Sequence, residues 1–312
     1  MPTINQVQTV EPVLTGILTA YQQAQSRFVA GRVFPAVPVQ TDSGSYLKLT
    51  KSYWFRDGLQ RRAPGDPFIR LDFGTESATF KTKQWAADEA IADEERANST
   101  LPLDLERAAI EHLGIASLIR KEVQWATDFM KTGVWGTDNT AATDWDDAAN
   151  SDPIADLIDA AGVISGATGF MPNTLVVGAI VDRALMKHPD VLDRLKYTQA
   201  ATQNNIRSAL AAMLGIENYI VSSAISITSV EGQTDVYAPI VDDDALLLYV
   251  NPAAGWNGVS AGKTFVWQPG GGEGSIYTYR DNSRHADVIQ HKEQWAQVAI
   301  APELGYFFSD IV

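Results

Sequence analysis

The longest helical pattern of the chain runs through residues 103–133 and limits what the whole chain can fold into. Apolar side chains recur there at spacings of three and four residues, at Leu105, Ala109, Leu113, Ala116, Ile119, Val123, Ala126 and Met130. Ser99 and Thr100 are suitable N-caps, and Gly133 provides a stop. About thirty residues give a helix of roughly 45 Å, longer than a small globular domain needs. We expect a spine along which other elements pack.

Short extended segments precede this spine. Residues 1–26 form a polar leader, which we interpret as an arm that contacts a neighbouring chain or as a frayed terminus. Pro35 and Pro38 then favour extended backbone. Residues 43–85 predict a two-stranded excursion whose loop tip lies near residues 57–67. Because an isolated hairpin buries too little surface to be stable, we expect this one to pack on another element.

The excursion and the segment after it carry opposite charges. Residues 48–83 hold eight Lys and Arg against four acidic residues, a net charge of +4, so the remainder of the chain carries −18. The loop tip contains Arg56, Arg61 and Arg62. An acidic block follows the excursion directly and consists of Asp88, Glu89, Asp93, Glu94 and Glu95. An arginine-rich loop of this kind is a candidate nucleic-acid grip, anion site or surface for another protein.

Composition narrows these classes. The 38 acidic residues outnumber the 24 basic ones, which opposes binding to nucleic-acid phosphates or to an anionic membrane over most of the surface. The chain has no cysteine, so disulfides, thiolate catalysis and zinc-thiolate sites are excluded. The N-terminus lacks a signal-peptide pattern, and no stretch reaches the roughly 18 apolar residues of a membrane span. We expect a folded, soluble chain made in the cytoplasm.

The second half of the chain predicts a mixed domain. Residues 137–153 form a polar linker and a candidate boundary. Helices are predicted at 152–165, 179–187 and 203–215, and strands at 173–178, 219–224, 245–250, 263–267 and 275–280. This mixture indicates an α+β or α/β domain of roughly 130 residues. Residues 285–308 alternate over a long run and predict one extended strand that returns to the spine.

Residues with catalytic or metal-binding chemistry form no recognisable constellation. The four histidines, at 112, 188, 285 and 291, build no H-E-x-x-H motif, and we expect His188 to cap a helix or to make a surface contact, and His285 and His291 to share one face of a strand. Acidic runs at 138–147 and 242–244 miss the spacing of a calcium loop or an acid-base pair. The glycines of 269–274 lack a phosphate-loop order and predict a connection between two strands. We expect no catalytic, cofactor-binding or metal site, and no enzyme.

Seven segments of the chain carry a resemblance to a known family. They fall within residues 28–224 and read RVFPAVPV, YWFRDGLQRRAPGDP, WAADEAIADEERAN, LPLDLERAAIEHL, RKEVQWATDFMKTGVW, MPNTLVVGAIVDRALMKHPDVLDRLKYT and ALAAMLGIENYIVSSA. Together with the order of the predicted elements, they resemble the major capsid proteins of tailed bacteriophages with the Hong Kong 97-type fold. Fewer motifs match in the carboxyl third.

The resemblance implies an α+β capsid fold with five parts. These are an N-terminal arm at 1–42, an extended β-hairpin loop and following segment at 43–98, a peripheral domain with the spine helix at 99–150, a mixed α/β axial domain at 151–285, and a return strand of the peripheral domain at 286–312. No long scaffold-like leader precedes the arm, so we expect it to be removed or replaced by a separate protein.

The implied function is a shell that assembles from many copies of the chain. The resemblance implies hexamers and pentamers in an icosahedral virion capsid, which encloses double-stranded DNA without sequence-specific binding and is assembled in the host bacterial cytoplasm. Scaffold, portal and decoration proteins are the further partners it implies, with no cofactor and no membrane. Two alternatives stay open here. One is an encapsulin-like bacterial nanocompartment shell that encloses cargo enzymes, and the other is a small-molecule enzyme.

Within this framework the charge pattern predicts a contact between subunits. We hypothesise that Arg56, Arg61 and Arg62 meet carboxylates of an adjacent subunit, with the acidic block among the candidates. Exposed ion pairs of this kind contribute only about 0 to 1 kcal/mol each, but they recur at every copy.

Overall fold

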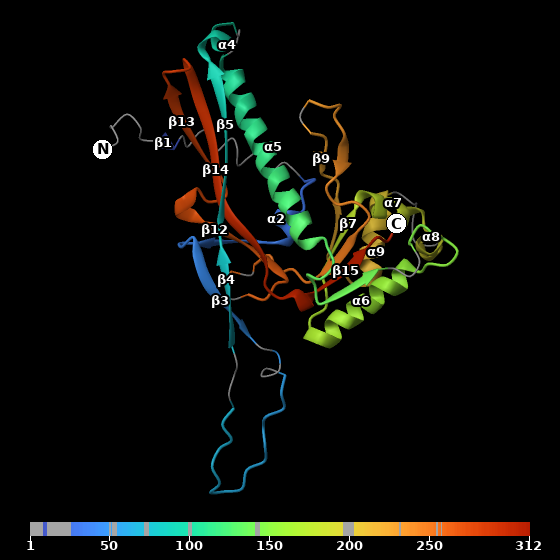
Figure 1. Ribbon diagram of the computed structural model, residues 1–312. Coiled ribbons are helices and arrows are strands. Elements are labelled where there is room, and N and C mark those ends of the chain that lie inside the picture. Colours follow the sequence, from blue (N-terminus) through green and yellow to red (C-terminus); the bar gives the residue numbers. More distant parts are fainter. Residues whose placement is uncertain are drawn as a thin grey trace.

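A long sheet, a spine helix beside it and a second, smaller sheet with its own helices make up the chain (Figure 1). A hairpin reaches far out from one end of the long sheet. The computed structural model describes residues 9–10, 26–49, 51, 55–71, 75–98, 102–140, 144–195, 203–230, 232–253, 255–256 and 258–312. Most of the leader at 1–26 and the N-caps Ser99 and Thr100 therefore lie outside the described residues.

The long sheet is organised around one strand, β14. The strand order is β1-β13-β14-β12-β2, and β5 pairs with the other edge of β14. Strands β13 and β12 follow one another along the same edge, because β13 pairs with residues 286–292 and β12 with residues 295–299. The bounds are β1 Thr9–Val10, β2 Ala36–Val39, β5 Lys83–Ala92, β12 Gly262–Trp267, β13 Ser275–Asp281 and β14 Ala286–Ala299.

The predicted spine is confirmed as helix α5, Pro102–Phe129, whose 28 residues extend over about 42 Å. Its first half packs Ile110 and Leu113 against Ile289 of the long sheet. Its second half places Trp125 and Phe129 against the short helix α2, Ala30–Val33, and the smaller sheet. Ala116, expected on the apolar face, is exposed instead.

The smaller sheet is buried on both faces. Its order is β6-β15-β11-β7-β8, and its two cores take alternate residues: Val176 of β7 faces the spine side, whereas Leu175 and Val177 face the helices. Continuous apolar strands are typical of a sheet covered on both sides. The strands are β6 Thr137–Thr140, β7 Thr174–Gly178, β8 Asn218–Ser222, β11 Ala245–Leu248 and β15 Gly305–Ser309, and the helices are α6 Pro153–Thr168, α7 Ala179–Lys187, α8 Pro189–Leu195 and α9 Gln203–Leu214.

The prediction of one extended strand over residues 285–308 is wrong. Strand β14 ends at Ala299, a 3-10 turn follows at Pro302–Leu304, and β15 then joins the smaller sheet beside β11. The alternating pattern continues through both strands, but Pro302 has no N–H to donate to a ladder and allows the chain to change sheets.

A boundary at 285/286 does not follow the sheets. Strands β12 and β13 precede it but pair with β14 in the long sheet, whereas β15 follows it and lies in the smaller one. The predicted linker at 137–153 is also more than a connection, because it contributes β6 and the buried Trp145 to the smaller sheet and its core. The five-part division stays a prediction.

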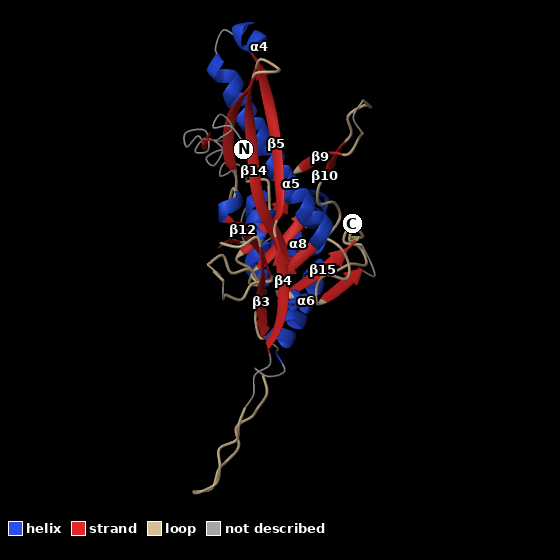
Figure 2. Cartoon of the chain, turned by 60° about the vertical axis from the view of Figure 1, so that its left-hand side comes forward, coloured by secondary structure: helices blue, strands red, loops and turns tan. Residues whose placement is uncertain are grey.

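Two hairpins stand apart from both sheets. The predicted excursion is the antiparallel pair β3, Ser43–Leu49, and β4, Thr75–Lys81, which continues the direction of the long sheet (Figure 2). The second pair, β9 at Ile225–Ile227 and β10 at Tyr237–Pro239, has no counterpart among the predicted elements. No helix in the described residues is long and apolar enough to cross a bilayer.

Candidate assembly surfaces

The loop at residues 55–71 is almost entirely exposed and contains the three arginines singled out in the sequence. Arg62 places its guanidinium 4.4 Å from the ring centre of Phe68 and donates from Nε to the carbonyl of Asp66. These local contacts hold the returning arm of the loop without using Arg56 or Arg61. The loop tip therefore presents positive charge to whatever lies beyond the chain.

The hairpin that carries this loop is anchored by aromatic packing. Tyr46 and Phe80 pack on Phe265 of β12, and the rings of Phe80 and Phe265 stack with centroids 4.3 Å apart. At its far end, Lys51 donates to the carbonyl of Ala167 at 3.0 Å and pairs with Glu303. The expected packing of the excursion on another element is thus confirmed at both ends, and its direction is set by the long sheet.

The acidic block divides into paired and unpaired residues. Asp93, the first residue of helix α4 (Asp93–Asn98), receives two hydrogen bonds from Arg280, and these lower the pKa of its carboxyl. Glu89 lies 3.1 Å from Nδ1 of His112 on the spine. Asp88, Glu94 and Glu95 form no ion pair with another described residue.

A ring of charges around Asp93 fixes the tip of the long sheet. Arg280 also pairs with Asp287, which in turn pairs with Arg96, and Arg96 reaches Glu106 at 2.8 Å. Burial of the Asp287 carboxyl works to raise its pKa, but the two guanidinium groups outweigh it and lower the pKa. This network ties α4 to the sheet and to the spine.

The loop tip and helix α4 lie at opposite ends of the molecule (Figure 1). The long sheet and the spine separate them, so the three arginines cannot reach Glu94 or Glu95 of their own chain. Within one chain the arginines of the loop tip and the acidic residues of α4 are too far apart to form a contact. A contact between them requires a second copy.

Two buried carboxylates link the spine to its surroundings, and neither was among the sequence candidates. Glu122, with none of its surface exposed, accepts the N–H groups of Val29 and Ala30 at 2.8 Å each and the hydroxyl of Ser222. Glu293 of β14 accepts from Ser117 and pairs with Lys121, both at 2.8 Å. The sequence offers no reason to single them out because acidic side chains usually face water, both on a helix, as for Glu122, and on a strand, as for Glu293.

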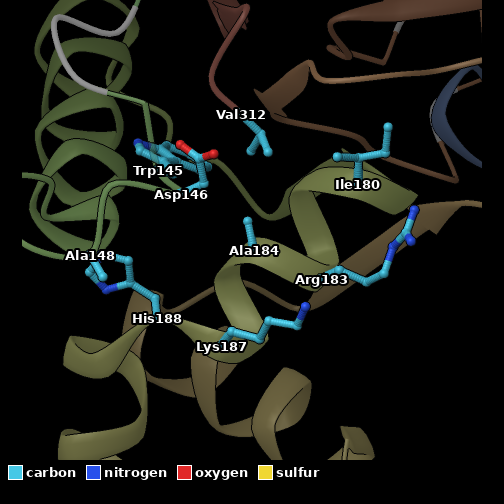
Figure 3. A pocket seen from close by; sticks show the side chains of 9 residues that line it. All are labelled: Trp145, Asp146, Ala148, Ile180, Arg183, Ala184, Lys187, His188 and Val312. Atoms are coloured by element: carbon cyan, nitrogen blue, oxygen red, sulfur yellow. The ribbon is translucent and has the colours of Figure 1, made fainter.

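The structure has a pocket of about 460 Å³ between α7, the segment before α6 and the C-terminal residue (Figure 3). Its wall includes His188, which lies near Ser151 and Asp190 in an arrangement that resembles a hydrolytic triad. Nδ1 of His188 accepts the backbone N–H of Asp190 at 3.3 Å, so Nε2 carries the proton and donates to Ser151. A ring in that tautomer cannot take a proton from Ser151. The expected capping role of His188 is confirmed, although the residue is buried.

The remaining sequence candidates have local structural roles. Asp138 accepts the N–H of Gly133, and Asp147 accepts from Ala149 and Asn150. Asp244 accepts the N–H of Asp310, and burial raises the pKa of its carboxyl to about 6. Within the described ranges no group of three or more His, Asp or Glu residues is placed to hold a metal ion.

Two further outcomes concern loops and strands. The glycine run at 269–274 connects β12 to β13, as predicted. His285 lies in a turn with a φ of 47°, and its carbonyl accepts the backbone N–H of Asp93, so it does not share a strand face with the buried His291. That prediction is wrong, because the turn before β14 reverses the chain at this residue.

Comparisons with known proteins agree with this geometry. The sequence matches the family described as phage major capsid protein E over residues 125–257. A major capsid protein of Burkholderia phage BcepMu is 26% identical over 242 residues, 76% of each chain. A phage-related protein from Bordetella bronchiseptica superposes with a TM-score of 0.75, 23% identity and 98% coverage of both chains. The capsid structure of cyanophage P-SCSP1u gives a TM-score of 0.58 at 11% identity, with 88% and 86% covered. The chain has the α+β fold of phage capsid proteins.

Proposed function

We propose that this chain is the major capsid protein of a tailed bacteriophage and that its copies assemble into the shell of the virion. The observation that carries the proposal is the joint match of fold and sequence to phage proteins. The capsid family matches residues 125–257, the capsid relative covers 76% of the chain, and the fold of the phage-related protein covers 98% of it. The shell is icosahedral, is built from hexamers and pentamers, and encloses a packaged double-stranded DNA genome. Shell building needs no catalytic chemistry, so the protein acts as a structural component and not as an enzyme.

The layout of the charges supports a head-to-tail contact between copies. The loop at 55–71 projects beyond one end of the long sheet, whereas α4 lies at the other end and Asp88 lies in the middle of β5. Asp88 and the α4 residues Glu94 and Glu95 form no ion pair with another described residue. A contact that joins two different surfaces of identical chains closes into a ring when the rotation between copies allows it. Arg56, Arg61 and Arg62 of one copy therefore face the acidic block of the next, with Asp93 and Glu89 less available because they have partners in their own chain.

The partners follow from this role. Other copies of the chain are the first, and scaffold, portal and decoration proteins complete the particle. Packaged DNA is enclosed without sequence-specific contacts, since the chain carries a net charge of −14. Assembly takes place in the cytoplasm of the host bacterium. No observation favours the alternative of a nanocompartment that encloses cargo enzymes.

Electron microscopy of the purified protein tests the proposal. We expect closed icosahedral shells, either from the chain alone or after coexpression with the neighbouring genes of its genome. Particles that hold a copurified enzyme and no genome would favour the nanocompartment. A chain that stays monomeric in light scattering under all these conditions would contradict shell building.

A further inference from the structure

The hairpin β9–β10 presents an apolar face that the described part of its own chain leaves uncovered. Ile227 lies opposite Tyr237 and Ile225 lies opposite Pro239, so these four side chains point to the same side of the two strands. Ile225, Ile227 and Tyr237 are 52%, 55% and 60% exposed. A two-stranded hairpin is marginally stable alone, and this one joins neither sheet of the described structure. Its apolar face therefore needs a surface to pack on.

Helix α6 presents a second uncovered apolar surface. Its inner face is buried in the core below the smaller sheet, but Ile158 and Val163 are about half exposed on the outside. Gly162 and Gly166 are also exposed on this helix, and a Cβ atom added at either would meet no atom within 4 Å. Along 153–168, all of which is described, Asp159 is the one charged residue exposed on this side. A helix that is apolar on both sides is typical of one buried on both sides.

The two surfaces lie on opposite sides of the smaller sheet. The hairpin projects toward the end of the molecule where α4 lies, whereas α6 borders the side from which the loop at 55–71 extends (Figure 1). One translation and rotation along that direction brings the hairpin of one copy to α6 of the next. The same displacement brings the loop tip of the second copy toward the acidic block of the first.

We propose that the β9–β10 hairpin of each copy docks on the outer face of α6 in the adjacent copy and so forms the inner ring of each capsomer. Two arguments identify a second copy as the occupant. Both surfaces are mainly apolar, with Asp159 as the one exposed charged residue on this side of α6, so bringing them together removes apolar area from water. The contact also runs in the same direction as the proposed loop contact. The glycines of α6 allow the backbone of the hairpin to approach closely. This inference rests on the proposed function.

Cross-linking tests the contact directly because the chain has no cysteine of its own. Ile227→Cys and Val163→Cys chains, distinguished by a mass tag, are mixed, assembled and treated with a short bis-maleimide. We expect dimers that contain one of each variant, at a yield at least about tenfold above that of Ile227→Cys mixed with Asn282→Cys, a matched exposed residue at the tip of the long sheet. In the double variant Val163→Cys/Ile227→Cys each copy can be linked to both neighbours. We expect a series of cross-linked oligomers on a denaturing gel, the largest of which contains as many copies as one ring.

The outcomes separate this inference from the function. Closed shells in the microscope without a link between residues 227 and 163 would overturn the docking proposal alone. Links of 227 to itself, or to a Phe68→Cys chain in place of 163, would overturn it too, since the hairpin would then have another occupant. If neither shells nor smaller assemblies form, both proposals fail. Circular dichroism of each variant before mixing checks that the exposed substitutions leave the fold intact.

Discussion

Two buried carboxylates beside the spine, those of Glu122 and Glu293, have pKa values that are shifted in opposite directions. Burial raises the pKa of Glu122, and its hydrogen bonds from two backbone N–H groups and Ser222 only partly offset this. Burial would also raise the pKa of Glu293, but the His291 ring and the Lys121 ammonium beside it outweigh burial and lower the pKa to about 2. The difference is that Glu293 has cationic chemistry within reach, whereas Glu122 has only neutral donors.

Glu122 is expected to hold α2, the spine and the smaller sheet together by accepting hydrogen bonds. Glu122→Gln keeps the acceptor for Val29 and Ala30, whereas Glu122→Ala leaves both N–H groups buried without a partner. We expect Glu122→Ala to lower the free energy of unfolding by about 2–4 kcal/mol, measured by urea denaturation of the unassembled chain.

The charge of Glu122 adds a pH dependence with a defined sign. Because the folded state raises the pKa, the stability tied to its proton is present at low pH and is lost as the pH rises through the folded pKa. The stability of Glu122→Gln relative to the unmodified chain should therefore increase from acidic to neutral pH. Equal stability losses in the Gln and Ala variants would show that hydrogen bonding is not what this residue supplies.

Glu293 should behave in the opposite way in acid. Its folded pKa of about 2 lies below the ordinary 4.5, so its contribution is present above the ordinary value and is lost as the pH falls toward 2. We expect the unmodified chain to lose about 3 kcal/mol more than Glu293→Gln between these pH values. Urea midpoints at a series of acidic pH values measure this, and parallel curves for the two proteins would contradict it.

At the scale of elements, the basic loop is held at its base and free at its tip. Tyr46, Phe80 and Lys51 fix the hairpin, but Arg56 and Arg61 contact nothing in the described part of their own chain. Reversing charge at the tip should therefore change assembly without changing the fold. The hairpin continues the direction of the long sheet, and we expect the arginines at its tip to make their contacts on another copy of the chain.

We expect Arg56→Glu/Arg61→Glu to lower the yield of particles several-fold while the unassembled chain keeps its melting temperature. Each exposed pair contributes only about 0 to 1 kcal/mol, but the loss repeats at every copy of a shell. Sucrose-gradient sedimentation and electron microscopy measure the yield.

A charge swap provides the control for the loop. Glu94→Lys/Glu95→Lys reverses the sign of the two acidic residues of α4 that form no ion pair with another described residue. Placed in the same chain as the loop reversal, it should restore particle yield, because opposite charges face each other again. Unchanged assembly in the loop variant, or no rescue in the combined one, would remove the pairing of these two surfaces.

At the scale of the whole molecule, charge is separated along one long axis. A positive tip at one end and an acidic end at the other favour chains that line up head to tail, while the net charge of −14 opposes random association. The same net negative charge weakens binding between a shell built from this chain and DNA inside it, because acidic side chains repel phosphates.

The intact chain should therefore bind duplex DNA weakly. At about 0.15 M salt we expect no saturable binding at micromolar protein, measured by fluorescence anisotropy of a labelled duplex. The loop-reversal variant should give the same result, since its arginines serve contacts between copies. A dissociation constant below about 1 µM that is lost in that variant would show instead that the loop grips nucleic acid.

The amino-acid sequence by itself determined those helices and strands that have a clear pattern of apolar, charged or turn residues. Three- and four-residue spacing predicted α5, charge and turn residues predicted the excursion with its basic tip, and continuous apolar runs predicted β7 and β11. Quoted segments such as the one around Trp125 carried the resemblance to capsid proteins. These features depend on residues that are close together in the sequence, so they can be predicted from one sequence without the fold.

Only the tertiary structure decided the features that depend on residues far apart. Glu122 lies three residues after Ile119 and four before Ala126 of the apolar stripe, but its charge indicates an exposed side chain, and only the fold shows that Val29 and Ser222 close over it. The strand pattern of 285–308 is continuous, yet β14 and β15 enter different sheets because each pairs with a strand distant in sequence. The basic tip and the acidic block are neighbours in sequence, and the long sheet carries them to opposite ends. Pairing and burial are set by the whole fold, which is why a contact that looks local in the sequence becomes one between subunits.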